Sequence, residues 1–139
     1  ATDLGLPLEA NDEIFRRLVF NVAASNKDDH TKNHSFILKQ GYFWELAPAY
    51  DVTHAHGTWS GAWTAQHSMG VNGKFNDIER QDLIDLGRRF SVRAPERVID
   101  GIVDTLSSWP DFAQTAGLSD SEQNRVWKDI SHCCHLLRW

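Results

Sequence analysis

A chain of 139 residues with 41% hydrophobic and 24% charged residues can bury a core, which excludes a disordered segment and fits one domain. The formal charge of -5 argues against a broad basic face for nucleic acid. No apolar run approaches the roughly 18 residues of a membrane span, and no export signal is recognisable, so we expect a cytoplasmic protein without membrane contact.

The first predicted element is an amphipathic helix beginning near Asn11, a residue suited to capping a helix. Apolar residues then recur at three- and four-residue intervals as far as Val22. The pattern ends at Ser25-Asn26, so a polar loop follows. Residues 35–39 and 42–46 are rich in β-branched and aromatic residues with Gln40-Gly41 between them, which predicts a β-hairpin.

Residues 54–75 contain glycines and tryptophans and are predicted to form an irregular, ordered loop. Three helices should follow: one capped by Asn76 and Glu79, one from Pro95 that ends before Pro110, and one that begins at Ser119. We therefore predict a mainly α fold with a small β-hairpin, as a single domain over residues 1–139.

The only cysteines, Cys133 and Cys134, are adjacent within His132-Cys133-Cys134-His135 and cannot join distant parts of the fold. A metal site is one interpretation of this run. A turn of helix with one cysteine packed inward is the simpler interpretation, and reduced thiols fit a cytoplasmic location.

The most informative motif is Asn26-Lys27-Asp28-Asp29-His30-Thr31-Lys32-Asn33, followed after the hairpin by Tyr50-Asp51. A carboxylate, an amide five residues later and a second carboxylate past a hairpin have the spacing of a phosphoryl-transfer site. Asp28 is suited to orient or deprotonate a hydroxyl group. Asn33 and Asp51 are suited to bind Mg²⁺.

Other polar residues of the motif have less certain roles. Lys32 can contact phosphate, and His30 can contact the nucleotide or brace the loop. Asp29 is an alternative general base, because two consecutive carboxylates do not easily point into one site. Spacing favours Asp28.

These segments, with Leu46-Ala47-Pro48-Ala49-Tyr50-Asp51, resemble the catalytic loop and metal-binding segment of the HipA family. That family consists of bacterial serine/threonine kinases that act as toxins in toxin–antitoxin pairs. In its Asp-x-His-x-Lys-Asn pattern the first Asp is the base and the Asn binds magnesium, which correspond to Asp28 and Asn33. The Asp of its Tyr-Asp pair, a second magnesium ligand, corresponds to Asp51.

The resemblance extends from about residue 11 to 90, including His67-Ser68-Met69-Gly70-Val71-Asn72-Gly73-Lys74, and covers only the family's C-terminal helical lobe. It implies ATP and Mg²⁺ as cofactors and a protein substrate. It also implies a helix-turn-helix antitoxin as a partner, with DNA reached only through it. A HipA-like kinase also needs an N-terminal lobe that clamps the nucleotide, so the chain alone is expected to be nearly inactive.

Two other functions compete with this interpretation. His54 and His56 have strand-like parity after Asp51, so with Asp28 and His30 they could build a metal-dependent phosphoesterase or nuclease. Alternatively, the chain is a non-catalytic module whose tryptophans, notably Trp59, Trp63 and Trp109, dock an antitoxin or the absent lobe.

Overall fold

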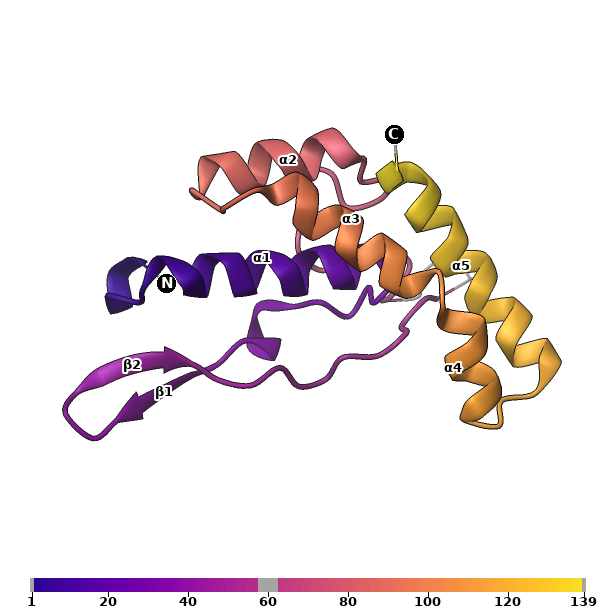
Figure 1. Cartoon of the computed structure of the whole chain (residues 1–139), viewed down its shortest axis with the longest axis horizontal. Helices are drawn as coiled ribbons and strands as arrows, with labels where there is room; N and C mark the ends of the chain where they lie inside the picture. Colours follow the sequence, from indigo (N-terminus) through magenta and orange to yellow (C-terminus); the bar gives the residue numbers. More distant parts are fainter. Residues whose placement is uncertain (1, 58–62, 139) are drawn as a thin grey trace.

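The computed structural model describes residues 2–57 and 63–138, and its regular structure is mainly helical, with one small β-hairpin (Figure 1). The helices are α1 (Leu8–Ala23), α2 (Arg80–Arg89), α3 (Pro95–Leu106), α4 (Trp109–Thr115) and α5 (Asp120–Arg138). The strands are β1 (Phe36–Lys39) and β2 (Phe43–Leu46), and short 3-10 turns lie at Thr2–Leu4 and Thr31–Asn33. This confirms the predicted fold class.

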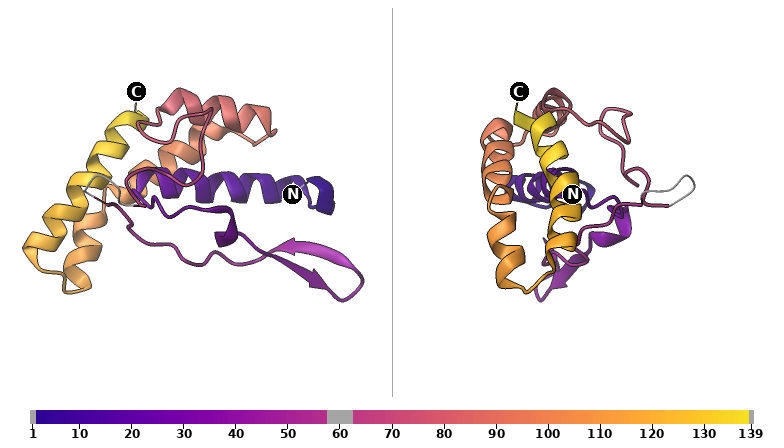
Figure 2. Two further views of the ribbon diagram at one scale, coloured as in Figure 1. Left: turned by 180° about the vertical axis from the view of Figure 1, so that it is seen from behind. Right: turned by 90° about the vertical axis from the view of Figure 1, so that its right-hand side faces the viewer.

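Helix α1 lies at the centre, with α2 and α3 along one side and the extended segments of the hairpin along the other (Figure 1). Helices α4 and α5 close one end, and the hairpin extends towards the opposite end, as the view from behind also shows (Figure 2). Residues from four helices are fully buried in a common core: Val19, Leu83, Ile99, Ile130 and Leu137. Burial of these apolar side chains is the main force that holds the helices together.

Helices α2 and α3 approach each other closely at Gly87. A Cβ atom added there would lie 2.6 Å from Pro95 Cβ and 3.3 Å from a ring carbon of Phe15. Glycine is therefore required at this position by space, because any larger side chain would push α2 away from α1 and α3.

The predicted cap of the first helix is wrong, because α1 begins three residues before Asn11, with Pro7 at its N-cap position. Asn11 instead lies within the helix, where its amide donates a hydrogen bond of 3.2 Å to the carbonyl of Phe90. The helix ends where predicted, and Ser25 has a positive φ of 55° just beyond it.

The cap of α2 also differs from the prediction. Glu79 and Asp82 form the capping box, in which the Glu79 backbone N–H donates to Asp82 Oδ2 at 2.9 Å, so the helix begins after Asn76. Lys74 pairs with Asp82 at 2.7 Å and strengthens this start. Helix α3 matches the prediction, but Pro110 lies in the first turn of α4, a helix that the sequence analysis did not predict.

The predicted hairpin is present, with Phe36 opposite Leu46 and Lys39 opposite Phe43. Its turn is one residue longer than predicted, because Tyr42 lies in the turn and not in the second strand. Gly41 and Tyr42 both adopt positive φ angles, of 97° and 62°. None of the described helices is long and apolar enough to cross a bilayer.

The last helix, α5, buries the predicted apolar stripe through Val126, Ile130, Cys134 and Leu137. Cys134 therefore packs inward, and burial raises the pKa of its thiol to about 11. Cys133, one residue earlier, is only partly buried, and both thiols are free. This matches the simpler interpretation of the His-Cys-Cys-His run.

Two isoleucine-to-alanine substitutions, one in the core and one in the hairpin, test which part of the fold contributes most to its stability. Ile99→Ala in α3 should lower the free energy of unfolding by about 3 kcal/mol, because the side chain is 0% exposed and leaves a cavity. Ile37→Ala in β1, where the side chain is 40% exposed, should cost less than about 1 kcal/mol. Urea unfolding followed by circular dichroism measures both, and equal losses would contradict this assignment of the core.

Candidate functional site

The loop that follows α1 lies beside the segment that follows Asp51. Asn26 and Ala55 form an isolated parallel bridge, in which the Lys27 N–H donates to the Ala55 carbonyl at 2.9 Å. The Ala55 N–H donates to the Ser25 carbonyl at 3.3 Å. This bridge brings together the two halves of the motif, which are separated by the hairpin in the sequence.

Asn26 strengthens the same junction from inside the protein. Its side chain is buried, and the amide nitrogen donates to Asn21 Oδ1 at 3.1 Å and towards the Asp51 carbonyl at 3.4 Å. Asp51 itself is exposed and has a positive φ of 55°, a conformation that aspartate tolerates better than most residues. The backbone around Asp51 is therefore fixed by a buried amide, while its side chain remains accessible.

The two consecutive aspartates of the motif have opposite environments. Asp29 is 1% exposed and accepts hydrogen bonds from His67 Nδ1 at 2.9 Å, the Ser68 N–H at 2.7 Å and the Met69 N–H at 3.2 Å. Its carboxylate is thus occupied in joining the loop to residues 67–69.

Asp28 is engaged far less. Its side chain is 19% exposed, and the nearest ionic partner, His30 Nε2, lies 3.5 Å from Oδ1. Within residues 2–57 and 63–138, Asp28 Oδ1 and His30 Nδ1 are both buried atoms without a hydrogen-bond partner. A buried carboxylate oxygen without a partner is costly in a folded protein and is typical of a site that awaits a ligand or a water molecule.

Asn33 is held by Asp28 and faces the same cavity as Asp51. Its amide nitrogen donates to the Asp28 carbonyl at 2.8 Å, which leaves the Oδ1 oxygen for another partner. Asn33 and Asp51 both line a cavity of about 190 Å³, together with Asn21, Arg17 and Tyr50. The structure therefore places the two predicted metal ligands on one cavity, next to the main chain of Asp28.

The remaining predicted residue, Lys32, is exposed and near this cavity. Its carbonyl accepts a hydrogen bond from the Tyr50 hydroxyl, which joins the first part of the motif to the residue before Asp51. Arg17 adds a second cation at the cavity, where its guanidinium donates to the Ala47 carbonyl at 2.9 Å and pairs with Glu13 at 3.0 Å. Both cations are chemically suited to attract phosphate.

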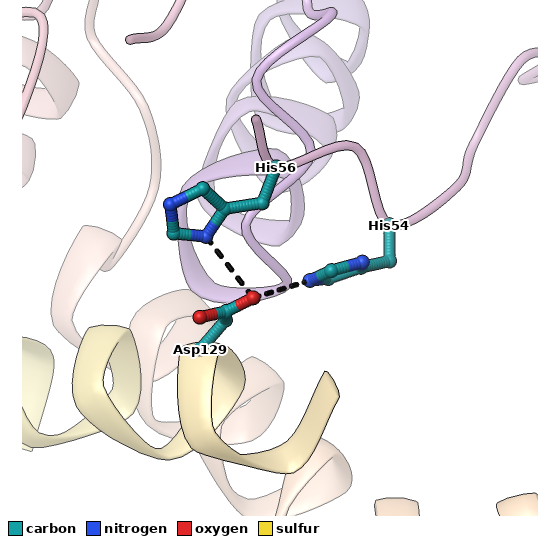
Figure 3. Close-up of side chains that lie close together, drawn as sticks. All are labelled: His54, His56 and Asp129. Carbon is teal, nitrogen blue, oxygen red and sulfur yellow. Dashed lines mark hydrogen bonds and ion pairs between the residues drawn. The ribbon is translucent and has the colours of Figure 1, made fainter. Parts of the chain in front are cut away.

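His54 and His56 lie elsewhere, against Asp129 of α5 (Figure 3). His54 Nε2 is 3.0 Å and His56 Nδ1 is 3.1 Å from Asp129 Oδ2. Burial and the neighbouring Lys27 lower the pKa of His56, which favours a neutral ring. The hypothesis that these histidines share a metal site with Asp28 and His30 is therefore wrong, since their carboxylate partner comes from the last helix.

Of the three tryptophans proposed for docking, the two in the described residues differ in their burial. Trp63 is 71% exposed, whereas Trp109 packs partly buried against the core. Trp59 lies outside the described residues. Trp109 is therefore better explained by packing than by docking.

A comparison with protein families assigns the chain to a family. The family model described as HipA-like C-terminal domain matches residues 3–135, almost the whole chain. The chain therefore belongs to the HipA-like C-terminal domain family. None of the curated proteins compared with the chain matches it significantly.

Three parts of the site were absent from the sequence analysis: the Asp29–His67 pair, the contact of Tyr50 with Lys32, and Asp129. His67-Ser68-Met69 had been noted only as part of the family resemblance. Asp129 stands 73 residues beyond His56 in the sequence, and no local pattern marks it as a partner of the two histidines.

Separate substitutions of the two aspartates distinguish their roles. Asp29→Ala should lower the free energy of unfolding by about 3 kcal/mol, because it leaves the buried His67 ring and two partly buried backbone N–H groups without an acceptor. Asp28→Ala should cost less than about 1 kcal/mol, because its side chain accepts no hydrogen bond in the described residues. Chemical denaturation measures both, and a larger loss for Asp28→Ala would reverse the assignment.

Proposed function

We propose that this chain is the C-terminal lobe of a HipA-like serine/threonine kinase toxin, which transfers the γ-phosphate of ATP to a protein hydroxyl group. The observation that carries the proposal is the shared cavity of Asn33 and Asp51 beside Asp28, in a chain of the HipA-like C-terminal domain family. The arrangement supplies oxygen ligands and an unoccupied carboxylate oxygen, which are the protein groups that phosphoryl transfer needs.

The residues at this cavity fit a magnesium ion. Asn33 offers an amide oxygen, because its nitrogen is held by the Asp28 carbonyl, and Asp51 offers an exposed carboxylate. Mg²⁺ prefers such oxygen ligands and commonly takes one or two from the protein and the others from water and phosphate. When bound, the ion would neutralise charge on the phosphate oxygens.

Asp28 is the residue proposed to act on the substrate hydroxyl. Its side chain is 19% exposed, and Oδ1 has no hydrogen-bond partner in the described residues, so the carboxylate has capacity to accept the proton of a serine or threonine hydroxyl group. Asp29 is the weaker candidate for this role, because its carboxylate is 1% exposed and already accepts three hydrogen bonds. His30 limits the rotation of Asp28 from 3.5 Å, and Lys32 is proposed to contact phosphate.

The proposed kinase requires partners. A nucleotide bound only by Asn33, Asp51 and Lys32 would remain open to solvent, so an N-terminal lobe is proposed to cover it. An apolar cavity of about 440 Å³ beside the loop, lined in part by Leu18, Met69 and Phe90, supports docking of that lobe there. A helix-turn-helix antitoxin remains the proposed regulator and would provide any contact with DNA.

The test is ATP-dependent phosphorylation by this chain co-expressed with an N-terminal lobe of a HipA-like kinase. Asp28→Asn and Asp51→Asn should each reduce transfer at least about 100-fold, because one removes the proton acceptor and the other a metal ligand. Asp104→Asn on the exposed surface of α3 is the matched control and should leave transfer unchanged. Radiolabelled ATP with a mixed protein substrate measures the rate.

Two results would contradict the proposal. Unchanged transfer in Asp28→Asn and Asp51→Asn would show that the phosphate is transferred elsewhere. Hydrolysis of a phosphodiester without ATP would show that the chain has a different activity.

A further inference from the structure

We propose that His54, His56 and Asp129 form a second metal site, for a transition-metal ion such as Zn²⁺, distinct from the proposed magnesium site. Two imidazoles and one carboxylate are ligands that zinc accepts readily, whereas magnesium prefers oxygen alone. The site would connect the segment that follows Asp51 to helix α5.

The three side chains already converge on one point. His54 Nε2 and His56 Nδ1 lie 3.0 and 3.1 Å from the same Asp129 oxygen, and all three ligand atoms lie within 4.8 Å of one another. Figure 3 shows both rings directed at that oxygen from one side of α5. Ligands bound to tetrahedral zinc at about 2.0–2.2 Å are separated by about 3.3–3.6 Å, so each nitrogen would move away from the Asp129 oxygen by a few tenths of an ångström. The two nitrogens, which lie within 4.8 Å of each other, would approach by at most about 1.5 Å.

The ligands are held by two independent supports. Asp129 lies in the middle of α5, which is anchored in the core by Val126 and Ile130. His54 and His56 flank Ala55, whose main chain is bridged to the loop after α1. Because a helix and a bridged segment provide the ligands, little conformational freedom would be lost on binding.

The site is accessible to an ion and to water. The exposed fractions of the three side chains are 15% for His54, 24% for His56 and 17% for Asp129. His56 and Asp129 also line a cavity of about 640 Å³ that is open to solvent. A water molecule from this cavity can complete four-coordination, as in zinc sites with three protein ligands.

The positive charge of Lys27 lies beside His56 and should weaken metal binding, which provides a way to test the site. Its Nζ lies 3.4 Å from His56 Nε2 and donates to the Ala65 carbonyl at 3.1 Å. If His56 binds a metal through Nδ1, the ring proton must move to Nε2, where it faces the lysine ammonium group. Lys27 should therefore weaken metal binding, whereas it is compatible with a simple hydrogen bond from His56 to Asp129.

The experiment is a titration of the untagged, chelator-treated chain with Zn²⁺, followed by calorimetry and by competition with a coloured chelator. We expect one ion per chain. His54→Ala and Asp129→Asn should each weaken binding at least about tenfold, because each removes a ligand. His132→Ala is the matched control: His132 is an exposed histidine of α5 on the same cavity, and its loss should change nothing.

Two further variants keep the test decisive. His54→Gln retains a hydrogen-bond donor for Asp129 but removes a good zinc ligand. The variant should therefore fold normally and bind Zn²⁺ more weakly than the wild-type chain. Lys27→Met should tighten Zn²⁺ binding several-fold, because it removes the opposing charge. Circular dichroism confirms that each variant is folded.

The inference would be overturned by any of three results: no stoichiometric binding at micromolar Zn²⁺, wild-type affinity in folded His54→Gln and Asp129→Asn, or an equal loss in His132→Ala. The last result would indicate adventitious binding to surface histidines. The measurement is independent of phosphoryl transfer, so it stands whether or not the kinase proposal holds.

Discussion

The arrangement of the site depends on one buried carboxylate. Asp29 accepts from a histidine ring and two consecutive backbone N–H groups, so the loop after α1 is fixed to residues 67–69 from across the protein. Asp28, the residue before Asp29, is 19% exposed and its Oδ1 has no hydrogen-bond partner in the described residues, so the fixed loop positions this carboxylate without binding it. The position of Asp28, the proposed proton acceptor, thus depends on its buried neighbour Asp29.

Around this anchor the protein builds a rigid junction from short polar contacts. The Asn26–Ala55 bridge, the buried Asn26 amide and the contact of Tyr50 with Lys32 all connect the loop to the segment containing Asp51. The helices contribute the hydrophobic base on which this junction rests, and α5 supplies Asp129 to its far side. Catalytic geometry generally requires such support, because small displacements are costly in rate.

Much of this could be predicted from the sequence. Periodic apolar residues identified α1, α3 and α5, and the spacing of Asp28, Asn33 and Asp51 indicated a shared site, of which Asn33 and Asp51 line one cavity. Helix starts were less predictable, because Asn11 and Asn76 have the right chemistry for caps but are used elsewhere or lie outside the helix. The choice between Asp28 and Asp29, and the partner of His54 and His56, depended on contacts with residues far away in the sequence.

The β-hairpin described above has a consequence for association. Among the described residues its sheet has only two strands, so each strand keeps one outer edge with unpaired backbone groups. Ile37, Leu38 and Phe43 expose apolar side chains along this ribbon, while the Lys39–Glu45 ion pair at 3.2 Å places charge near its tip. A strand from another polypeptide can extend such a ribbon by main-chain hydrogen bonding alone, and the paired charges oppose indiscriminate growth into aggregates.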